Sequence, residues 1–180
     1  SWIKGSGADV PSTSYQAYVG TVNSGAISTF MRRTVTCENR LTTIAAEMPL
    51  REAALLGCAI ATGAGMVMNT AQAKPGDSVA VFGLGGIGLS AVMAAKVNGA
   101  EKIIAVDVLA DKLATAKKLG ATHTIDASKN DPSEAIRDLT GGAGADVAIE
   151  AAGLQQTMEA AFGSVRYGGG LAILAGNVAL

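Results

Sequence analysis

Between residues 78 and 174, short apolar runs alternate with longer segments of helical spacing. Strands that alternate with helices in this way are typical of βαβ units, whose right-handed crossovers place the strands in one parallel sheet. The pattern therefore predicts an α/β fold with a doubly wound parallel sheet. The expected strands are 78–82, 102–107, 123–125, 147–150 and 171–174, and the expected helices are 86–98, 110–119, 131–139 and 154–162.

The chain before residue 78 has a less regular pattern. Residues 1–24 are rich in Ser, Gly and Thr and predict an irregular loop, whereas 27–36 predict one or two strands. We place the domain boundary near Leu56. Residues 1–55 would then form part of a first, β-rich lobe with its linker, and 56–180 the parallel-sheet domain.

An apolar helix is expected around this boundary. It begins near Pro49, continues through 53–61, is interrupted at Gly63 and Gly65, and resumes over 66–73. No apolar run approaches the roughly 20 residues that a bilayer span needs, so we expect no membrane partner.

The composition is typical of a globular protein rather than a disordered one, with 49% hydrophobic and 16% charged residues. A net charge of −1 gives no sign of a nucleic-acid partner. Two cysteines, Cys37 and Cys58, do not make a disulfide framework, so we expect a reducing cytoplasm. The N-terminal segment has no apolar region of the signal-peptide type and no initiating Met, so the chain looks cut from something longer.

A glycine-rich segment follows the first expected strand of the sheet. Residues 83–88 fit the pattern G-x-G-x-x-G and open a helix, which is the context that a Rossmann dinucleotide-binding loop requires. Gly83 permits the tight turn, Gly85 lets the backbone approach a pyrophosphate, and Gly88 allows close helix–strand packing. The free N–H groups at the helix start, nearest Gly86 and Ile87, would face the phosphates.

An acidic residue ends the second strand of the sheet. Asp107 lies at about the spacing after Gly88 at which an acid binds the adenosine ribose. A carboxylate there accepts hydrogen bonds from ribose hydroxyls and repels a 2′-phosphate, so NAD is favoured over NADP. The alternative is that Asp107 only caps the following helix, and the two roles are compatible.

The chain from about Gly25 to its end resembles the zinc-dependent, medium-chain alcohol dehydrogenases. The resemblance is carried by three segments, Leu-Gly-Cys-Ala-Ile-Ala-Thr-Gly at 56–63, Lys-Pro-Gly-Asp with the strand and glycine loop at 74–88, and Lys-Lys-Leu-Gly-Ala-Thr at 117–122. It implies that 1–55 are a remnant of the family's N-terminal catalytic (GroES-like) lobe.

The resemblance implies roles for several residues on the nicotinamide side. Cys58 matches a ligand of the catalytic zinc, and Thr62 matches a threonine that packs beside the nicotinamide. The backbone of Ala175, Gly176 and Asn177 matches the segment that borders the nicotinamide ring and its carboxamide.

On the adenosine side the resemblance implies two further contacts. Lys112, five positions after Asp107, matches a basic residue that reaches the adenosine. The chain near Ala151 and Ala152 is expected to pass the adenosine end of the cofactor.

The departures from the family concern the metal and the ends of the chain. Catalytic zinc needs about three protein ligands and an open position. Cys58 matches one ligand, whereas His123 and Cys37 match none, and the others would lie in the part of the catalytic domain that is absent. The sixth strand of the sheet is expected beyond Leu180.

These features predict the NAD(H)-binding domain of a zinc-dependent alcohol dehydrogenase, in which zinc would polarise the alcohol and hydride would pass to NAD. The partners would be a small alcohol or carbonyl compound and, in the parent, further copies of the same chain. Two alternatives stay open: a cofactor-binding module that is inactive by itself, and a zinc-free quinone or enoyl reductase of the same superfamily.

Overall fold

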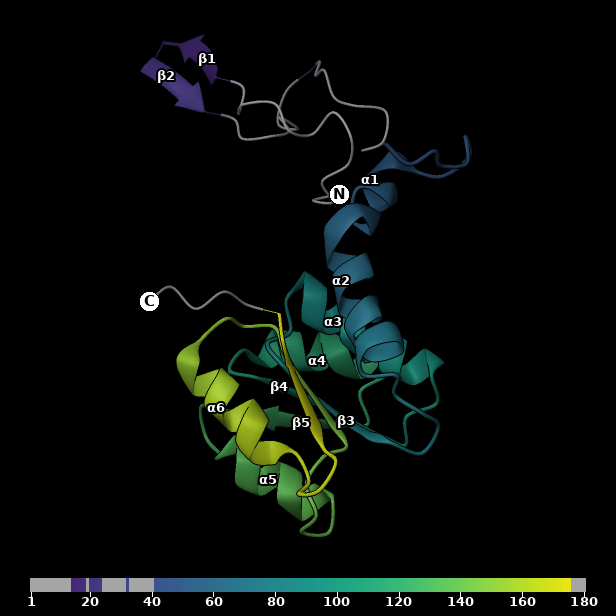
Figure 1. Ribbon diagram of the computed structural model, residues 1–180, viewed down its shortest axis with the longest axis vertical. Helices are drawn as coiled ribbons and strands as arrows, with labels where there is room; N and C mark the ends of the chain where they lie inside the picture. The colour runs from purple at the N-terminus through teal and green to yellow at the C-terminus, as the bar shows by residue number, and fades with distance from the viewer. Residues whose placement is uncertain (1–13, 19, 24–31, 33–40, 176–180) are drawn as a thin grey trace. The chain divides into compact units, whose positions relative to one another are not determined.

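The computed structural model describes residues 14–18, 20–23, 32 and 41–175 (Figure 1). The chain divides into two compact units, Ser1–Ala53 and Ala54–Leu180. That the first unit is the remnant of a catalytic lobe stays a prediction.

The described part of the first unit contains a short β-hairpin and one helical turn. Strands β1 (Ser14–Ala17) and β2 (Gly20–Asn23) pair in antiparallel register, and α1 spans Leu50–Ala53. The expectation of an irregular loop is therefore wrong for 14–17 and 20–23, where the short alternation of Tyr15, Ala17 and Val22 with polar residues was the missed signal. The strands expected at 27–36 lie outside the described residues, apart from Arg32.

The second unit begins with a helical segment that runs without the expected interruption. It consists of η2 (Leu56–Ile60), α2 (Ala61–Gly65) and η3 (Met66–Thr70), of which the first and last are π-helical. Gly63 continues the helix because its missing side chain is needed there: a Cβ would lie 2.2 Å from the carbonyl oxygen of Ile87 in α3 (Gly86–Val97). Close packing between the two helices thus decides the conformation over helix propensity.

This uninterrupted helix also changes the expectation about apolar runs. Residues 50–70 form 21 helical residues of mean hydropathy 1.4, so by length and composition alone the segment is long enough to cross a membrane. The expectation that no apolar run approaches this length is wrong. Met66 and Val67 are buried in the core of the second unit, while only 17% of the most apolar window of the segment is buried.

The rest of the unit is a five-stranded parallel sheet in the order β5-β4-β3-β6-β7. The strands are β3 (Ser78–Phe82), β4 (Lys102–Asp107), β5 (His123–Asp126), β6 (Val147–Glu150) and β7 (Leu171–Leu174). The chain moves outward from β3 to β5, crosses back to β6 and continues to β7, which is the doubly wound Rossmann arrangement. The predicted fold class is confirmed.

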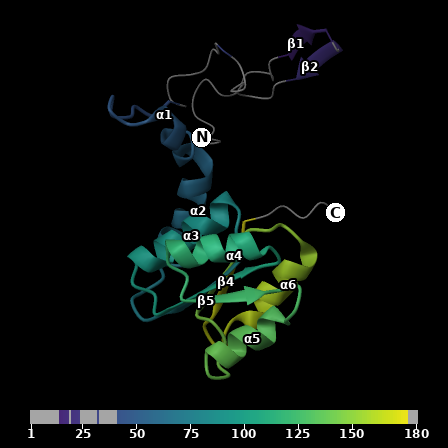
Figure 2. The same cartoon turned by 180° about the vertical axis from the view of Figure 1, so that it is seen from behind.

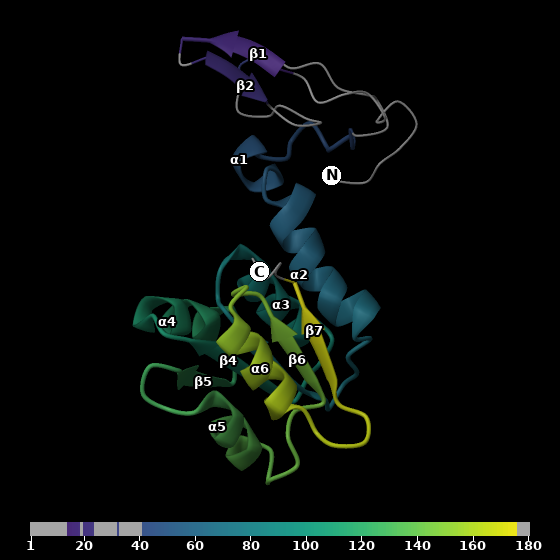
Figure 3. The same ribbon diagram turned by 60° about the vertical axis from the view of Figure 1, so that its left-hand side comes forward.

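Helices cover both faces of this sheet (Figures 2 and 3). On one face, α3 (Gly86–Val97) and α4 (Ala110–Leu119) bury a cluster that includes Val79, Val81 and Ile103. On the other, α5 (Pro132–Leu139) and α6 (Gln155–Ser164) cover Phe82 and Ile104. The strands carry apolar residues toward both layers, as expected for a sheet buried on both faces.

Candidate functional site

The carboxyl ends of three neighbouring strands meet at one edge of the sheet. In the strand register, Phe82 at the end of β3 lies opposite Val106 of β4 on one side and Glu150 of β6 on the other. The loops that follow these strands therefore come together at this edge, which we call the carboxyl edge. The strand order changes direction here, and in open α/β sheets such a point forms a ligand-binding crevice.

The three glycines of the loop after β3 meet different surroundings. Gly83 has φ +83°, and a Cβ there would lie 2.7 Å from the backbone nitrogen of Ala152. A Cβ on Gly88 would lie 1.8 Å from the carbonyl oxygen of Gly83, whereas a Cβ on Gly85 would meet no atom within 4 Å. Gly83 and Gly88 are thus required by the protein's own backbone, and Gly85 leaves open space.

Helix α3 starts directly above this open space. Its N-cap residue is Gly85, which has no side chain to accept a hydrogen bond from the first turn. Gly86 is exposed and Ile87 half-buried. The unpaired N–H groups of the first turn and the positive end of the helix dipole can bind an anion at this position.

Asp107 connects the glycine loop to the turn after β4. Its Oδ2 accepts a hydrogen bond from the N–H of Leu84 at 2.8 Å, and its Oδ1 accepts from Val108 at 2.8 Å and Leu109 at 3.0 Å. These bonds close the turn before α4 but do not cap the helix, because its N-cap residue Leu109 makes no side-chain cap hydrogen bond, so the capping alternative considered from the sequence is wrong. A carboxylate has about four acceptor positions, so the half-buried Asp107 keeps about one for a further donor.

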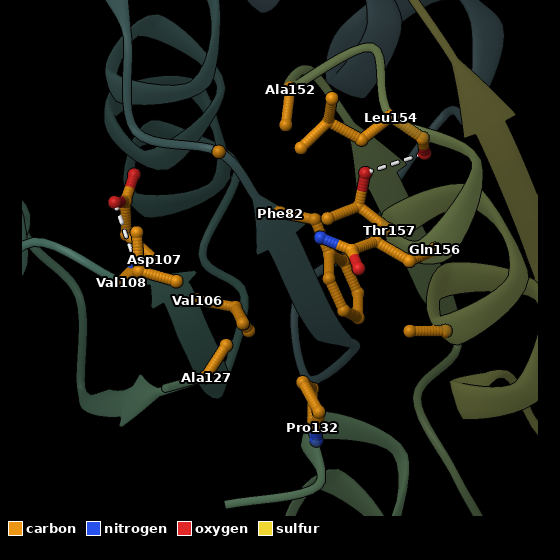
Figure 4. A pocket seen from close by; sticks show the side chains of 12 residues that line it. Phe82, Val106, Asp107, Val108, Ala127, Pro132, Ala152, Leu154, Gln156 and Thr157 are labelled. Carbon is orange, nitrogen blue, oxygen red and sulfur yellow. Dashed lines mark hydrogen bonds between the residues drawn. The ribbon is translucent and has the colours of Figure 1, made fainter. Parts of the chain in front are cut away.

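A largely apolar pocket of about 260 Å³ opens at the carboxyl edge beside Asp107 (Figure 4). Val106 and Val108 lie on one side of it, and Leu154 and Thr157 on the other. The sequence analysis did not assign these residues to a site, although Val106 lies near the end of β4 and the other three follow β4 or β6. The lining residues are Phe82, Gly83, Val106, Asp107, Val108, Ala127, Pro132, Ala152, Leu154, Gln156, Thr157 and Ala160.

Of the two neighbouring alanines expected on the adenosine side, only one lines the pocket. Ala152 lines the pocket, whereas Ala151 does not belong to the lining and donates its N–H to the carbonyl oxygen of Phe82 at 2.8 Å. Lys112 lies half-buried in the first turn of α4, three residues past Leu109. Ala152 therefore faces the pocket and Ala151 does not, and the role of either residue toward adenosine stays a prediction.

The residues expected on the nicotinamide side lie on two elements. Thr62 is half-buried on α2, in the helical segment that packs on α3 beside Gly86, whose Cβ would lie 3.2 Å from that of Ala59. Ala175 follows β7 and donates its N–H to the carbonyl oxygen of Glu150 at 2.8 Å. Gly176 and Asn177 lie outside the described residues.

The described residues do not fit a zinc site. Cys58 is exposed, and among the described residues no group of three His, Cys, Asp or Glu side chains is placed to hold a metal ion. His123 lies at the start of β5, with its Nδ1 at 2.9 Å from the hydroxyl of Thr122. Cys37 lies outside the described part of the chain.

The sequence analysis also missed a buried acid at this edge. Glu150 ends β6 and is fully buried. Its Oε1 accepts hydrogen bonds from the N–H groups of Ala152 and Gly153 and from the hydroxyl of Thr157, each at 2.8 Å. Its Oε2 has no partner among the described residues. An acid at the end of a central strand was the available signal.

The opposite, amino edge of the sheet has an acid that bonds two neighbouring side chains. Asp146 accepts hydrogen bonds from the N–H and hydroxyl of Ser78 at Oδ2, and from Nε of Arg166 at Oδ1. Partial burial pushes the pKa of Asp146 upward, but the hydrogen bonds from Ser78 and Arg166 outweigh it and hold the pKa below its ordinary value.

Comparisons with known proteins agree with this geometry. Residues 86–179 match the protein-family model of the zinc-binding dehydrogenases. An alcohol dehydrogenase zinc-binding domain protein from Burkholderia ambifaria is 40% identical, with a TM-score of 0.75 over 82% of this chain and 40% of that one. Benzyl alcohol dehydrogenase from Acinetobacter calcoaceticus is 34% identical, with a TM-score of 0.79 over 86% of this chain and 42% of that one.

A further similar structure is a quinone oxidoreductase from Pseudomonas syringae pv. Tomato, which is 33% identical, with a TM-score of 0.70 over 76% of this chain and 41% of that one. This chain thus spans about two-fifths of the length of these relatives. The family match covers more than half of its 180 residues and confirms the resemblance expected from the sequence. The chain belongs to the zinc-binding dehydrogenase family and carries the Rossmann-type fold of that family.

Proposed function

We propose that this chain is the NAD(H)-binding part of an NAD-dependent alcohol dehydrogenase, whose intact form transfers a hydride between an alcohol and NAD. The observation that carries the proposal is the open space at Gly85, directly before the uncapped start of α3. Gly85 has no side chain, although no protein atom occupies the space that a Cβ would fill. The backbone N–H groups at the start of α3 face this space. A pyrophosphate fits this combination of shape and charge.

The adenosine half of the cofactor would enter the apolar pocket beside Asp107. The base would lie between Val108 and Ala152, which belong to the loops after β4 and β6. The remaining acceptor position of Asp107 would take a ribose hydroxyl, and Lys112 would approach from the first turn of α4. The negative charge of Asp107 opposes a 2′-phosphate, which supports NAD over NADP.

The nicotinamide half would extend from Gly85 toward Thr62 and the segment 175–177. Bound nicotinamide supplies the hydride chemistry, and the chain's contribution is to hold the ring in place. Cys58 by itself does not hold a metal ion firmly, so the chain alone is expected to bind NAD without oxidising alcohols. The cytoplasmic location and the homo-oligomeric parent remain part of this proposal.

A second candidate is a zinc-free reductase that acts on a quinone or enoyl substrate. The 33% identity to a quinone oxidoreductase favours it about as much as the 34% identity to benzyl alcohol dehydrogenase favours the first. Cys58 and Asp107 support the alcohol dehydrogenase, because the resemblance gives the cysteine a role only in a zinc enzyme and the acid disfavours NADP.

Calorimetric titration of the chain with NAD(H) and NADP(H) tests the proposal. Tighter binding of NAD(H) is expected, and equal or reversed affinities would contradict it. A second experiment tests whether the chain alone binds NAD without oxidising alcohols. It follows NADH absorbance with primary, secondary and aromatic alcohols and includes metal analysis of the chain. Steady turnover with one equivalent of tightly held zinc would contradict this expectation, because ligands besides Cys58 would then come from this chain or from a neighbouring copy.

A further inference from the structure

Glu150 is a fully buried acid that the proposed function does not use. It lies at the centre of the carboxyl edge, opposite Phe82 of β3 in the strand register. A buried charged group costs free energy unless its hydrogen bonds are satisfied, and one of its two carboxylate oxygens has no partner among the described residues. Support of the fold alone does not account for a carboxylate here.

The paired oxygen gathers three donors that belong to the wall of the pocket. Oε1 accepts from the backbone of Ala152 and Gly153 and from the hydroxyl of Thr157, each at 2.8 Å. The single hydrogen of that hydroxyl is shared with the carbonyl oxygen of Leu154, also at 2.8 Å. Ala152 and Thr157 both line the pocket, and they come from the loop after β6 and from α6. One buried oxygen therefore fixes two parts of the same wall.

The same contact fixes the distance between this wall and the glycine loop. The nitrogen and Cβ of Ala152 lie so close to Gly83 that a Cβ on Gly83 would meet them at 2.7 and 2.8 Å. The N–H of Ala152 can reach Oε1 only while the loop lies in this position. Loss of the acceptor would free the loop and widen the slot between Ala152 and Val108.

We infer that Glu150 is a positioning residue of the dinucleotide site, which sets the width of the adenosine slot by holding Ala152 and Thr157 on one carboxylate oxygen. This inference rests on the proposed function, because it assigns the slot to the adenosine of NAD. Glu150 does not line the pocket itself and acts through the residues that it holds.

Two substitutions at this position separate positioning from general support of the fold. In Glu150→Gln the amide oxygen can accept the same three hydrogen bonds, while the NH₂ group occupies the place where Oε2 has no partner. We expect a lower unfolding midpoint, with dissociation constants for NAD and 5′-AMP within about threefold of the unmodified chain. In Glu150→Ala all three bonds are lost, and both constants should rise about tenfold.

Binding is measured by calorimetry well below the unfolding midpoint of each variant, with Glu159→Ala as the matched control. Glu159 is an exposed acid on α6 that bonds Gln155 at 2.8 Å, and its loss should leave both constants unchanged. Binding of NAD by the unmodified chain tests the proposed function, whereas the ratio of variant to unmodified constants tests this inference. Unchanged constants in folded Glu150→Ala, or equal losses in the Gln and Ala variants, would overturn it.

A second variant covers the case in which Glu150→Ala does not fold. Thr157→Val keeps the shape of the side chain and removes one of the three donors. It should raise the constant for 5′-AMP about threefold, and Thr157→Ser should restore it. No change in Thr157→Val would overturn the inference independently of the variants at position 150.

Discussion

The two edges of the parallel sheet differ in how their polar groups are satisfied. At the amino edge, Asp146, Ser78 and Arg166 bond one another, and the backbone N–H of Asp146 returns a bond to the hydroxyl of Ser78 at 3.0 Å. At the carboxyl edge, α3 begins without a side-chain cap and Gly85 faces open space. The same strands therefore begin at side chains that bond one another beside a pocket of about 200 Å³, and end at an uncapped helix start beside the pocket of about 260 Å³.

Under the proposed function, this difference separates groups that stabilise the fold from groups that would bind the cofactor. Where polar atoms already have protein partners, substitution should lower the free energy of unfolding and leave cofactor affinity unchanged. Where backbone donors and space have no protein partner, substitution should lower cofactor affinity and leave the free energy of unfolding unchanged. Some residues at the carboxyl edge serve both purposes, and these test how strictly the division holds.

The largest effect is expected at Gly88. This glycine is part of the binding motif, but it is required by close packing within the protein. In Gly88→Ala the new Cβ would lie 1.8 Å from the carbonyl oxygen of Gly83, so helix and strand must move apart. We expect a loss of about 3 kcal/mol in the free energy of unfolding, measured by urea titration. Gly57→Ala, where a Cβ meets nothing within 4 Å, is the control and should not destabilise the chain.

Gly85→Val should give the opposite result. Gly85 has an extended backbone with φ −76° and ψ −166°, and a Cβ there meets no protein atom within 4 Å. The free energy of unfolding should change by less than about 0.5 kcal/mol. Affinity for NAD should fall at least about 100-fold, because the side chain fills the space assigned to the pyrophosphate. Undiminished binding by the folded variant would show that the cofactor does not use this loop.

The sequence predicts the glycine loop better than it predicts the opposite wall of the pocket. Gly88 follows from the spacing of the motif, because close helix–strand packing is part of what the pattern encodes. The wall opposite Val108 could not be read in the same way, since Ala152, Thr157 and Glu150 come together only once β6 lies beside β3. Likewise, the continuous helix through Gly63 depends on its contact with Ile87, a neighbour that no local pattern reveals.

Asp107 both stabilises the loops through its hydrogen bonds and is proposed to bind the ribose, so its substitution should affect both functions. Asp107→Ala removes the charge that opposes a 2′-phosphate, but it also releases the N–H groups of Leu84, Val108 and Leu109. We expect NAD affinity to fall about tenfold and NADP affinity to fall less, so that the preference narrows without reversing. Calorimetry with both cofactors measures this. A rise in NADP affinity would mean that the contact with Leu84 is unimportant for binding.

A smaller effect, limited to stability, is expected at the amino edge. The pKa of Asp146 is lower in the folded chain than its ordinary 3.8, so its contribution is present above that pH and is lost as the pH falls through the folded-state value. Asp146→Asn should lower the free energy of unfolding by about 1 kcal/mol at neutral pH, and the difference should shrink as the solution is acidified. The exposed Asp138→Asn is the control. A change in NAD affinity would contradict the separation of the two edges.

The smallest effect is expected at Asp126, which lies opposite Asp107 in the register of β4 and β5 but is satisfied locally. Its carboxylate bonds Lys129 at 2.8 Å, and that contact, with the hydroxyl and N–H of Ser128, lowers its pKa to about 2. Lys129→Ala should therefore move the pKa back toward 3.8, as followed by NMR titration of the carboxyl group. Both side chains of the pair are accessible to solvent, and at about 0.15 M salt charges are screened beyond about 8 Å. NAD affinity should accordingly stay within about twofold. A larger loss would place Asp126 and Lys129 among the groups that bind the cofactor. The binding part of the carboxyl edge would then extend as far as β5.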